Sequence, residues 1–175
     1  MVEKIKFIEV ELPIVNHKVD LIANKIEELD NRTVKLDLTR KLRGKNVEFI
    51  FKLKVEDGKL IVDPYRIFIF KFFIRRIMRK SIDYVEDSFS ANCKNAQLKI
   101  KIFLITRKKV PRAVRKALRE KAKEEIISEI NKQTYEEFFG ELLSSRFQKN
   151  LSLKLKKIYP LAFCDIVDSF VERKI

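Results

Sequence analysis

Residues 47–62 of this 175-residue chain read VEFIFKLKVEDGKLIV. From Val47 to Val55, apolar side chains alternate with charged ones such as Lys52, which is the pattern of a strand with one buried face. Asp57 and Gly58 form a pair typical of a tight turn, and residues 60–62 return as a second strand. This stretch therefore predicts a β-hairpin.

Similar alternation recurs along the chain and predicts further strands. One strand is expected over residues 4–12, ending at Pro13, and another over residues 33–38. Residues 82–90 and 97–105 form a second predicted strand pair, joined by residues 91–96. A short strand at residues 162–167 is expected to complete the sheet.

The period changes after Pro64. Phe70, Phe73, Ile74 and Ile77 fall on one face of a helix, and Pro64 suits the first turn of such a helix. Alternation over residues 66–72 leaves its starting point open between helix and strand.

The C-terminal part is predicted to be helical. A long amphipathic helix begins at Pro111, and Thr134 with Glu137 forms a capping box for a second one. A third amphipathic run ends before Tyr159 and Pro160. Strands followed by helices indicate an α+β fold, and the absence of linkers or repeats predicts one domain over residues 1–175.

The charge of the chain points to a polyanionic partner. There are 39 Lys+Arg against 25 Asp+Glu, which gives a net charge of +14, and 46% of the residues are hydrophobic. RNA or DNA is the leading partner, and an anionic membrane surface is second. The most apolar run, residues 67–77, is too short and too charged to cross a bilayer. The apolar side of the basic helix after Pro111 is needed for the protein core, so binding to a membrane surface is not expected either.

The surplus charge is concentrated in two segments. Residues 64–80 contain six basic and no acidic residues, and residues 105–123 contain nine basic residues and one acidic residue. This distribution favours a directed phosphate-binding surface. The predicted RNA-binding residues are Arg75, Arg76, Arg79 and Lys80 on one helix, Arg107, Lys108 and Lys109 in a loop, and Arg112, Arg115, Lys116 and Arg119 along the following helix.

Two smaller groups of cations favour RNA binding and a solvated surface equally. They are Arg40, Lys41, Arg43 and Lys45 before the hairpin, and Lys154, Lys156 and Lys157 near the C-terminus.

Little in the sequence suggests catalysis, a cofactor or a metal. His17 is the one histidine, and it is expected to be an ordinary surface or loop residue. Cys93 and Cys164 are isolated and are expected to be reduced thiols in the cytosol. The chain is therefore predicted not to be an enzyme, although an RNA-processing enzyme stays open as a weak alternative.

Several motifs occur in an order that resembles the archaeal and eukaryotic "S three A-e" family of small-subunit ribosomal proteins. The motifs span about residues 28–165, and the most specific is KKIYPL at residues 156–161. The others are FIRRIMRKSID at 73–83, the strand at 98–105, VRKAL at 114–118 and TYEEF at 134–138. Two family motifs differ here, since KNAQ at 94–97 replaces a Lys-Asp-Gly-Tyr turn and DPYR at 63–66 replaces a Thr-Arg-Asp helix start. Because strand-like sequence begins almost at Met1, no basic N-terminal extension like that of the family is expected.

The resemblance implies a barrel-like antiparallel sheet packed with C-terminal helices, and no catalytic activity. It implies a structural protein of the small ribosomal subunit that binds rRNA on the platform near the mRNA exit and supports assembly and translation. Its partners would be small-subunit rRNA, neighbouring platform proteins and mRNA, in the cytoplasm and bound to the ribosome. A free-standing RNA-binding regulator or assembly factor is the alternative.

Overall fold

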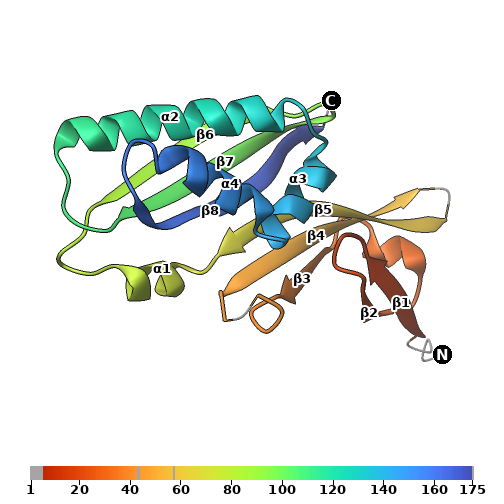
Figure 1. The fold of residues 1–175 in the computed structure, drawn as a ribbon. Coiled ribbons are helices and arrows are strands. Elements are labelled where there is room, and N and C mark those ends of the chain that lie inside the picture. The colour runs from red at the N-terminus through yellow and green to blue at the C-terminus, as the bar shows by residue number, and fades with distance from the viewer. Residues whose placement is uncertain (1–5, 43, 57, 175) are drawn as a thin grey trace.

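The computed structural model describes residues 6–42, 44–56 and 58–174. The described ranges form eight strands, four α-helices and one short 3-10 helix in an α+β arrangement (Figure 1). The strands are β1 (Lys6–Leu12), β2 (His17–Ala23), β3 (Thr33–Asp37), β4 (Val47–Glu56), β5 (Lys59–Ile69), β6 (Tyr84–Asn92), β7 (Ala96–Thr106) and β8 (Leu161–Lys174). The helices are η1 (Ile26–Leu29), α1 (Lys71–Ile77), α2 (Arg112–Ile130), α3 (Tyr135–Leu143) and α4 (Arg146–Leu155).

The predicted hairpin and strand pair are confirmed. β4 and β5 pair antiparallel, as do β6 and β7. Phe49, Phe51 and Leu53 are fully buried, in agreement with the alternation that predicted the strand. Gly58 has a φ of 73°, which suits its place in the turn, whereas Asp57 lies outside the described residues, as do Lys4 and Ile5 of the first predicted strand.

The main sheet has six strands in the order β3-β4-β5-β8-β7-β6, and all neighbouring pairs are antiparallel. The expectation of a barrel-like sheet is wrong, because β3 and β6 are the two edges of an open sheet. β5 pairs with β8 at Arg66–Phe68 alone, so the two halves of the sheet are joined through a short ladder. Helices, instead of closure by strands, complete the core.

The C-terminal helices lie over one face of this sheet (Figure 1). α2 packs on β6, α4 on β8, and α3 contacts β5. The buried stripe of α2 consists of Leu118, Ala122, Ile126 and Ile130, which recur every four residues and face the sheet. The predicted long helix is therefore confirmed, together with the reason for its apolar spacing.

Pro64 does not begin a helix, in contrast to the sequence prediction. β5 continues through Pro64 to Ile69, and α1 starts at Lys71. Pro64 faces Phe51 where the ladder between β4 and β5 shifts register, and the β8 ladder begins two residues later, at Arg66. A proline without an N–H is tolerated at such a bulge, where no partner on the β8 side needs a donor.

Two other elements differ from the sequence prediction. β8 extends over Leu161–Lys174, well beyond the short strand expected at residues 162–167, because it pairs with β7 along its length. The β1–β2 hairpin adds a strand that was not predicted. Ile14 and Asn16 take positive φ values in its turn, which a sequence reading does not anticipate for isoleucine.

The capping box at the start of α3 is confirmed. The Thr134 side chain accepts a hydrogen bond from the Glu137 N–H at 3.3 Å, and the Glu137 carboxylate accepts one from the Thr134 N–H at 2.9 Å. The bond from the Thr134 N–H holds the pKa of Glu137 below its usual value. Two of the otherwise free N–H groups at the helix start are thereby satisfied.

We expect Thr134→Ala to lower the free energy of unfolding by about 1 kcal/mol, because the substitution removes the side-chain acceptor of the cap. Urea unfolding followed by circular dichroism would measure the loss. Thr134→Ser keeps the acceptor and is expected to retain the wild-type value. Equal stability of the alanine and serine variants would contradict a contribution from the cap.

Candidate nucleic-acid interface

The two basic segments of the sequence meet in the structure through Asp83 and Thr106. The Asp83 carboxylate accepts a hydrogen bond from the Val110 N–H at 2.9 Å, and the Asp83 carbonyl accepts one from the Thr106 N–H at 2.9 Å. The fully buried Thr106 hydroxyl accepts from the Asp83 N–H at 3.1 Å. The segment that follows α1 is thus fastened to the segment that precedes α2, and both lie at the same end of the molecule (Figure 1, left).

The first basic segment occupies α1 and the chain after it. Arg75 and Arg76 are exposed on α1, and the guanidinium of Arg76 lies 5.4 Å from the ring centre of Phe73. Arg79 and Lys80 are also exposed, but α1 ends at Ile77, so these two lie in the connection to β6 and not on the predicted helix. The four cations therefore follow a bend in the chain.

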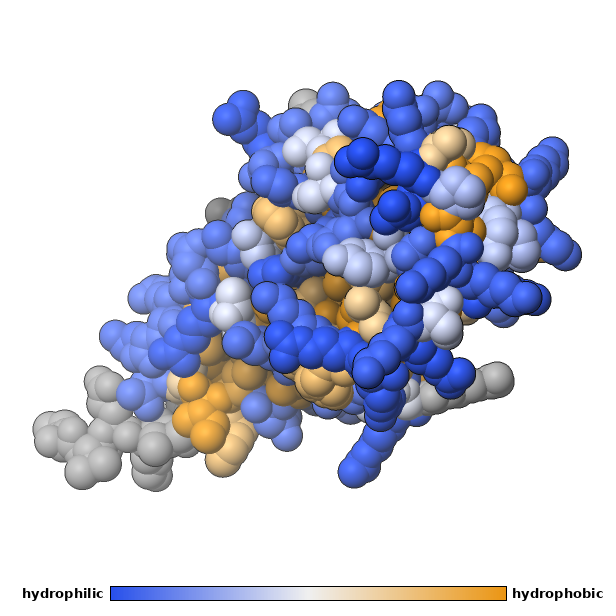
Figure 2. Space-filling view, turned by 90° about the vertical axis from the view of Figure 1, so that its left-hand side faces the viewer, coloured by the Kyte–Doolittle hydropathy of each residue, from blue (hydrophilic) through white to orange (hydrophobic). Residues whose placement is uncertain are grey.

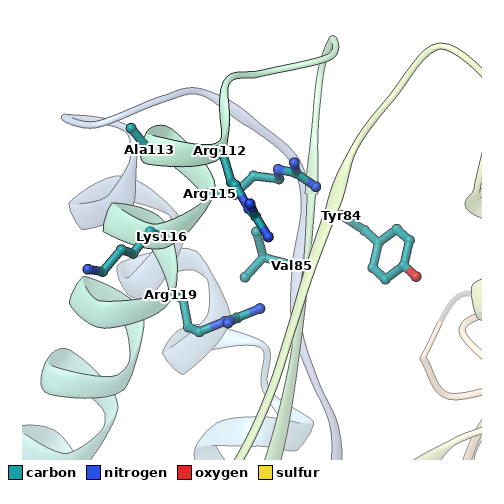
Figure 3. A pocket seen from close by; sticks show the side chains of 7 residues that line it. All are labelled: Tyr84, Val85, Arg112, Ala113, Arg115, Lys116 and Arg119. Atoms are coloured by element: carbon teal, nitrogen blue, oxygen red, sulfur yellow. The ribbon is translucent and has the colours of Figure 1, made fainter.

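The second basic segment forms a loop and the first turns of α2. Arg107, Lys108 and Lys109 are exposed in the loop, as predicted from the sequence. Arg112, Arg115 and Arg119 point from α2 towards β6, whereas Lys116 points away from them (Figure 3). Lys116 instead lies 3.8 Å from Glu120 of the same helix.

The three arginines line a groove of about 860 Å³ whose other wall is β6 at Tyr84 and Val85. The Val85 side chain points towards the arginines, whereas the Tyr84 ring projects from the other side of the strand (Figure 3). We call this groove the arginine groove. No carboxylate lines it within the part of the chain that the structure describes. None of its arginines has an ion-pair partner among those residues, and Nε of Arg115 is buried without a hydrogen-bond partner there.

The electrostatics of the arginine groove suit a phosphate. Three neighbouring guanidinium groups repel one another unless an anion lies between them, and each can donate two hydrogen bonds to phosphate oxygens. α2 begins in the same place, and its first turn contains no acidic residue and no side-chain cap. The positive end of the helix dipole and its free N–H groups therefore add to the attraction.

The surface around the groove is polar. Figure 2 views the molecule from this end, where hydrophilic side chains surround a hollow with hydrophobic side chains at its base. Tyr84 was not among the predicted site residues, although it lines the groove at β6 and is 48% exposed, with its ring on the side of the strand away from the arginines (Figure 3). Tyr84 precedes Val85 in a strand whose residues alternate between buried and exposed. This alternation could have identified Tyr84 as an exposed residue next to the site.

The weaker candidate cations fall into two groups: those that pair with carboxylates and those that are exposed on the surface. Lys45 forms an ion pair with Asp165 at 2.5 Å, and Lys154 lies 2.8 Å from both Glu125 and Glu129. These two lysines therefore have partners within the protein. Arg40, Lys41, Lys156 and Lys157 are exposed, with Lys41 donating to the Val15 carbonyl at 3.4 Å, and Arg43 lies outside the described residues.

Both cysteines are free thiols. Burial raises the pKa of Cys93 to about 11 and that of Cys164 to about 12, so both stay protonated at neutral pH. In the described ranges, no three His, Cys, Asp or Glu side chains cluster as a metal site would require. No helix in those ranges combines the length and the apolar character needed to span a membrane.

Comparison with known proteins agrees with the motifs at residues 73–83 and 156–161. The sequence pattern that defines the Ribosomal S3Ae family matches residues 6–174, which is nearly the whole chain. The chain is also 26% identical over 171 residues to the small ribosomal subunit protein eS1 of Nanoarchaeum equitans, covering 93% of this chain and 86% of that protein. That family is a structural, non-enzymatic class of ribosomal proteins. The chain belongs to the Ribosomal S3Ae family.

Proposed function

We propose that this protein is a structural component of the small ribosomal subunit and binds small-subunit rRNA through the basic end of the molecule. The observation that carries the proposal is the arginine groove, where three arginines without ion-pair partners in the described ranges face one wall of the sheet. Membership of the family and the name of the relative from Nanoarchaeum equitans support the ribosomal role.

The proposed RNA surface combines the two basic segments held together at Asp83. It comprises Arg75, Arg76, Arg79, Lys80, Arg107, Lys108, Lys109, Arg112, Arg115, Lys116 and Arg119, with Arg40, Lys41, Lys156 and Lys157 as further exposed cations. A bent chain of cations that leads into a groove suits folded RNA, which proteins recognise mainly by shape and backbone. We place the protein on the platform near the mRNA exit, among platform proteins, in the cytoplasm.

Sedimentation separates this function from a free-standing RNA-binding regulator or assembly factor, which could use the same surface. Lysate from cells that make the protein is layered on sucrose gradients at low and at moderate salt, and the protein is quantified by immunoblotting. We expect the protein to migrate with small subunits at one copy each and to remain there at moderate salt, because many phosphate contacts act together. Migration at the top of the gradient, or in substoichiometric amounts with precursor particles, would favour the regulator or assembly factor.

A further inference from the structure

A second groove lies between α1 and the face of the sheet opposite to α2. Residues alternate along β6, so Val85 faces the arginine groove while Glu86 lines this second one. The groove has a volume of about 700 Å³, and four phenylalanines, Phe68, Phe70, Phe72 and Phe103, contribute to its walls. We call it the phenylalanine groove.

The rings of this groove leave flat faces available. Phe72 is 56% exposed and stacks on Phe70 with ring centres 5.4 Å apart and planes at 21°. Tyr84 stacks on Phe103 at 5.4 Å and 16°, and Tyr84 also lines the arginine groove. Tyr84 therefore joins the two grooves around the edge of β6.

The charges of the phenylalanine groove leave a positive surplus. Glu86 pairs with Lys101 at 2.8 Å, and Asp168 binds Arg66 through two hydrogen bonds. Lys71 and Arg75 are exposed and have no ion-pair partner among residues 6–42, 44–56 and 58–174. The carboxylates of Glu86 and Asp168 are thus neutralised. Lys71 and Arg75, beside the exposed rings, are available to bind phosphates.

We propose that the phenylalanine groove binds unpaired nucleotides of single-stranded RNA, with bases stacked on Phe72 and Tyr84 and phosphates beside Lys71 and Arg75. Exposed aromatic faces next to unpaired cations are the arrangement that binds single strands without sequence preference. Continuity with the arginine groove through Tyr84 favours RNA over a peptide as the occupant. This inference rests on the proposed RNA-binding function and adds to it a site for unstacked bases.

The test compares single-stranded and duplex RNA on the full-length chain. Fluorescence anisotropy measures binding of a labelled oligouridylate and of a blunt-ended RNA duplex with the same number of phosphates. Phe72→Ala is expected to weaken binding of oligouridylate about tenfold, because it removes one base-stacking surface, and to leave duplex binding unchanged. Phe72→Trp keeps a flat ring and is expected to retain wild-type affinity for both.

Leu153→Ala is the matched control, since Leu153 is another exposed apolar side chain and lines neither groove. Its affinity for both RNAs should equal that of the wild type. Unchanged oligouridylate binding by Phe72→Ala, or an equal loss on both RNAs, overturns the phenylalanine groove as a single-strand site while leaving the proposed function intact. Phe72→Ala could weaken retention of the protein in small subunits and leave its affinity for oligouridylate unchanged. That result would show that the phenylalanine groove binds a protein partner and not RNA. Failure of the wild-type protein to bind either RNA would instead count against both the proposed function and this site.

Discussion

Reversing Arg112, Arg115 and Arg119 to glutamate is expected to abolish incorporation of the protein into small ribosomal subunits. The three side chains line the arginine groove and have no ion-pair partner within the described residues. A charge-assisted hydrogen bond to phosphate contributes about 1.5–3 kcal/mol, so three such contacts together correspond to more than about a thousandfold in affinity. Carboxylates in their place would add repulsion from the same phosphates.

The measurement is the fraction of tagged protein that sediments with small subunits. A matched variant reverses Arg32, Lys35 and Lys59, which are exposed cations outside both basic segments, and so changes the net charge equally. That variant is expected to incorporate normally, because the contacts depend on position and not on total charge. Thermal unfolding of both variants verifies that they fold, and normal incorporation of the arginine variant would contradict the proposed surface.

The second large effect concerns the ion pair between Lys45 and Asp165, which fastens the loop before β4 to β8. The two side chains are 18% and 7% exposed, and the Asp165 carboxylate also accepts hydrogen bonds from the Gln148 side chain at 3.2 Å and the Ile166 N–H at 2.9 Å. Lys45→Met would leave the carboxylate buried without its counter-ion. We expect the free energy of unfolding to fall by about 3–5 kcal/mol at neutral pH.

The loss should depend on pH in a defined direction. Burial raises the pKa of Asp165 even beside Lys45, and removal of the lysine raises it further. A carboxyl whose pKa is higher in the folded than in the unfolded state binds its proton more tightly when folded. The difference between variant and wild type should therefore shrink as the pH falls towards about 4, the ordinary carboxyl pKa, and grow as the pH rises.

Urea unfolding at a series of pH values measures both effects. Lys149→Met is the control, because Lys149 is an exposed lysine that lines the same surface hollow as Lys45, and no carboxylate pairs with it in the described ranges. That variant should unfold as the wild type does. A loss for Lys45→Met below about 1 kcal/mol, the range of surface ion pairs, would show that Asp165 is hydrated in solution.

Local patterns in the sequence predicted most of the helices and strands. Strands β3, β4, β6 and β7, helix α2 and the cap at Thr134 follow from spacing alone, because each depends on neighbours within a few residues. The predicted start of α1 at Pro64 was wrong. Pro64 lies in β5, opposite Phe51, where the ladder shifts register and does not need its N–H. The length of β8 was underestimated, because its pairing partner β7 lies more than fifty residues earlier in the chain.

The candidate site divides in the same way. Counting charges identified residues 64–80 and 105–123 as basic, and eleven cations of these segments were named as RNA-binding residues. Lys71, Lys121 and Lys123 are also exposed in the two segments and were not predicted. Lys116 was predicted together with the arginines of the same helix, whereas the structure turns it away from them (Figure 3). Tyr84 of β6, which was not predicted, also lines the groove. The sequence prediction also grouped Lys45 and Lys154 with the other cations. In the structure each of them pairs with a carboxylate that is far away in the sequence.

The sequence by itself determined that this protein is α+β, strongly basic and similar to the Ribosomal S3Ae family, because these properties reside in composition, local periodicity and short motifs. The tertiary structure alone decided that the sheet stays open and that Asp83 unites the two basic segments. It also decided which cations pair with carboxylates and which have no such partner within the described residues. Those outcomes depend on contacts between residues far apart in the chain, and no local pattern encodes such contacts.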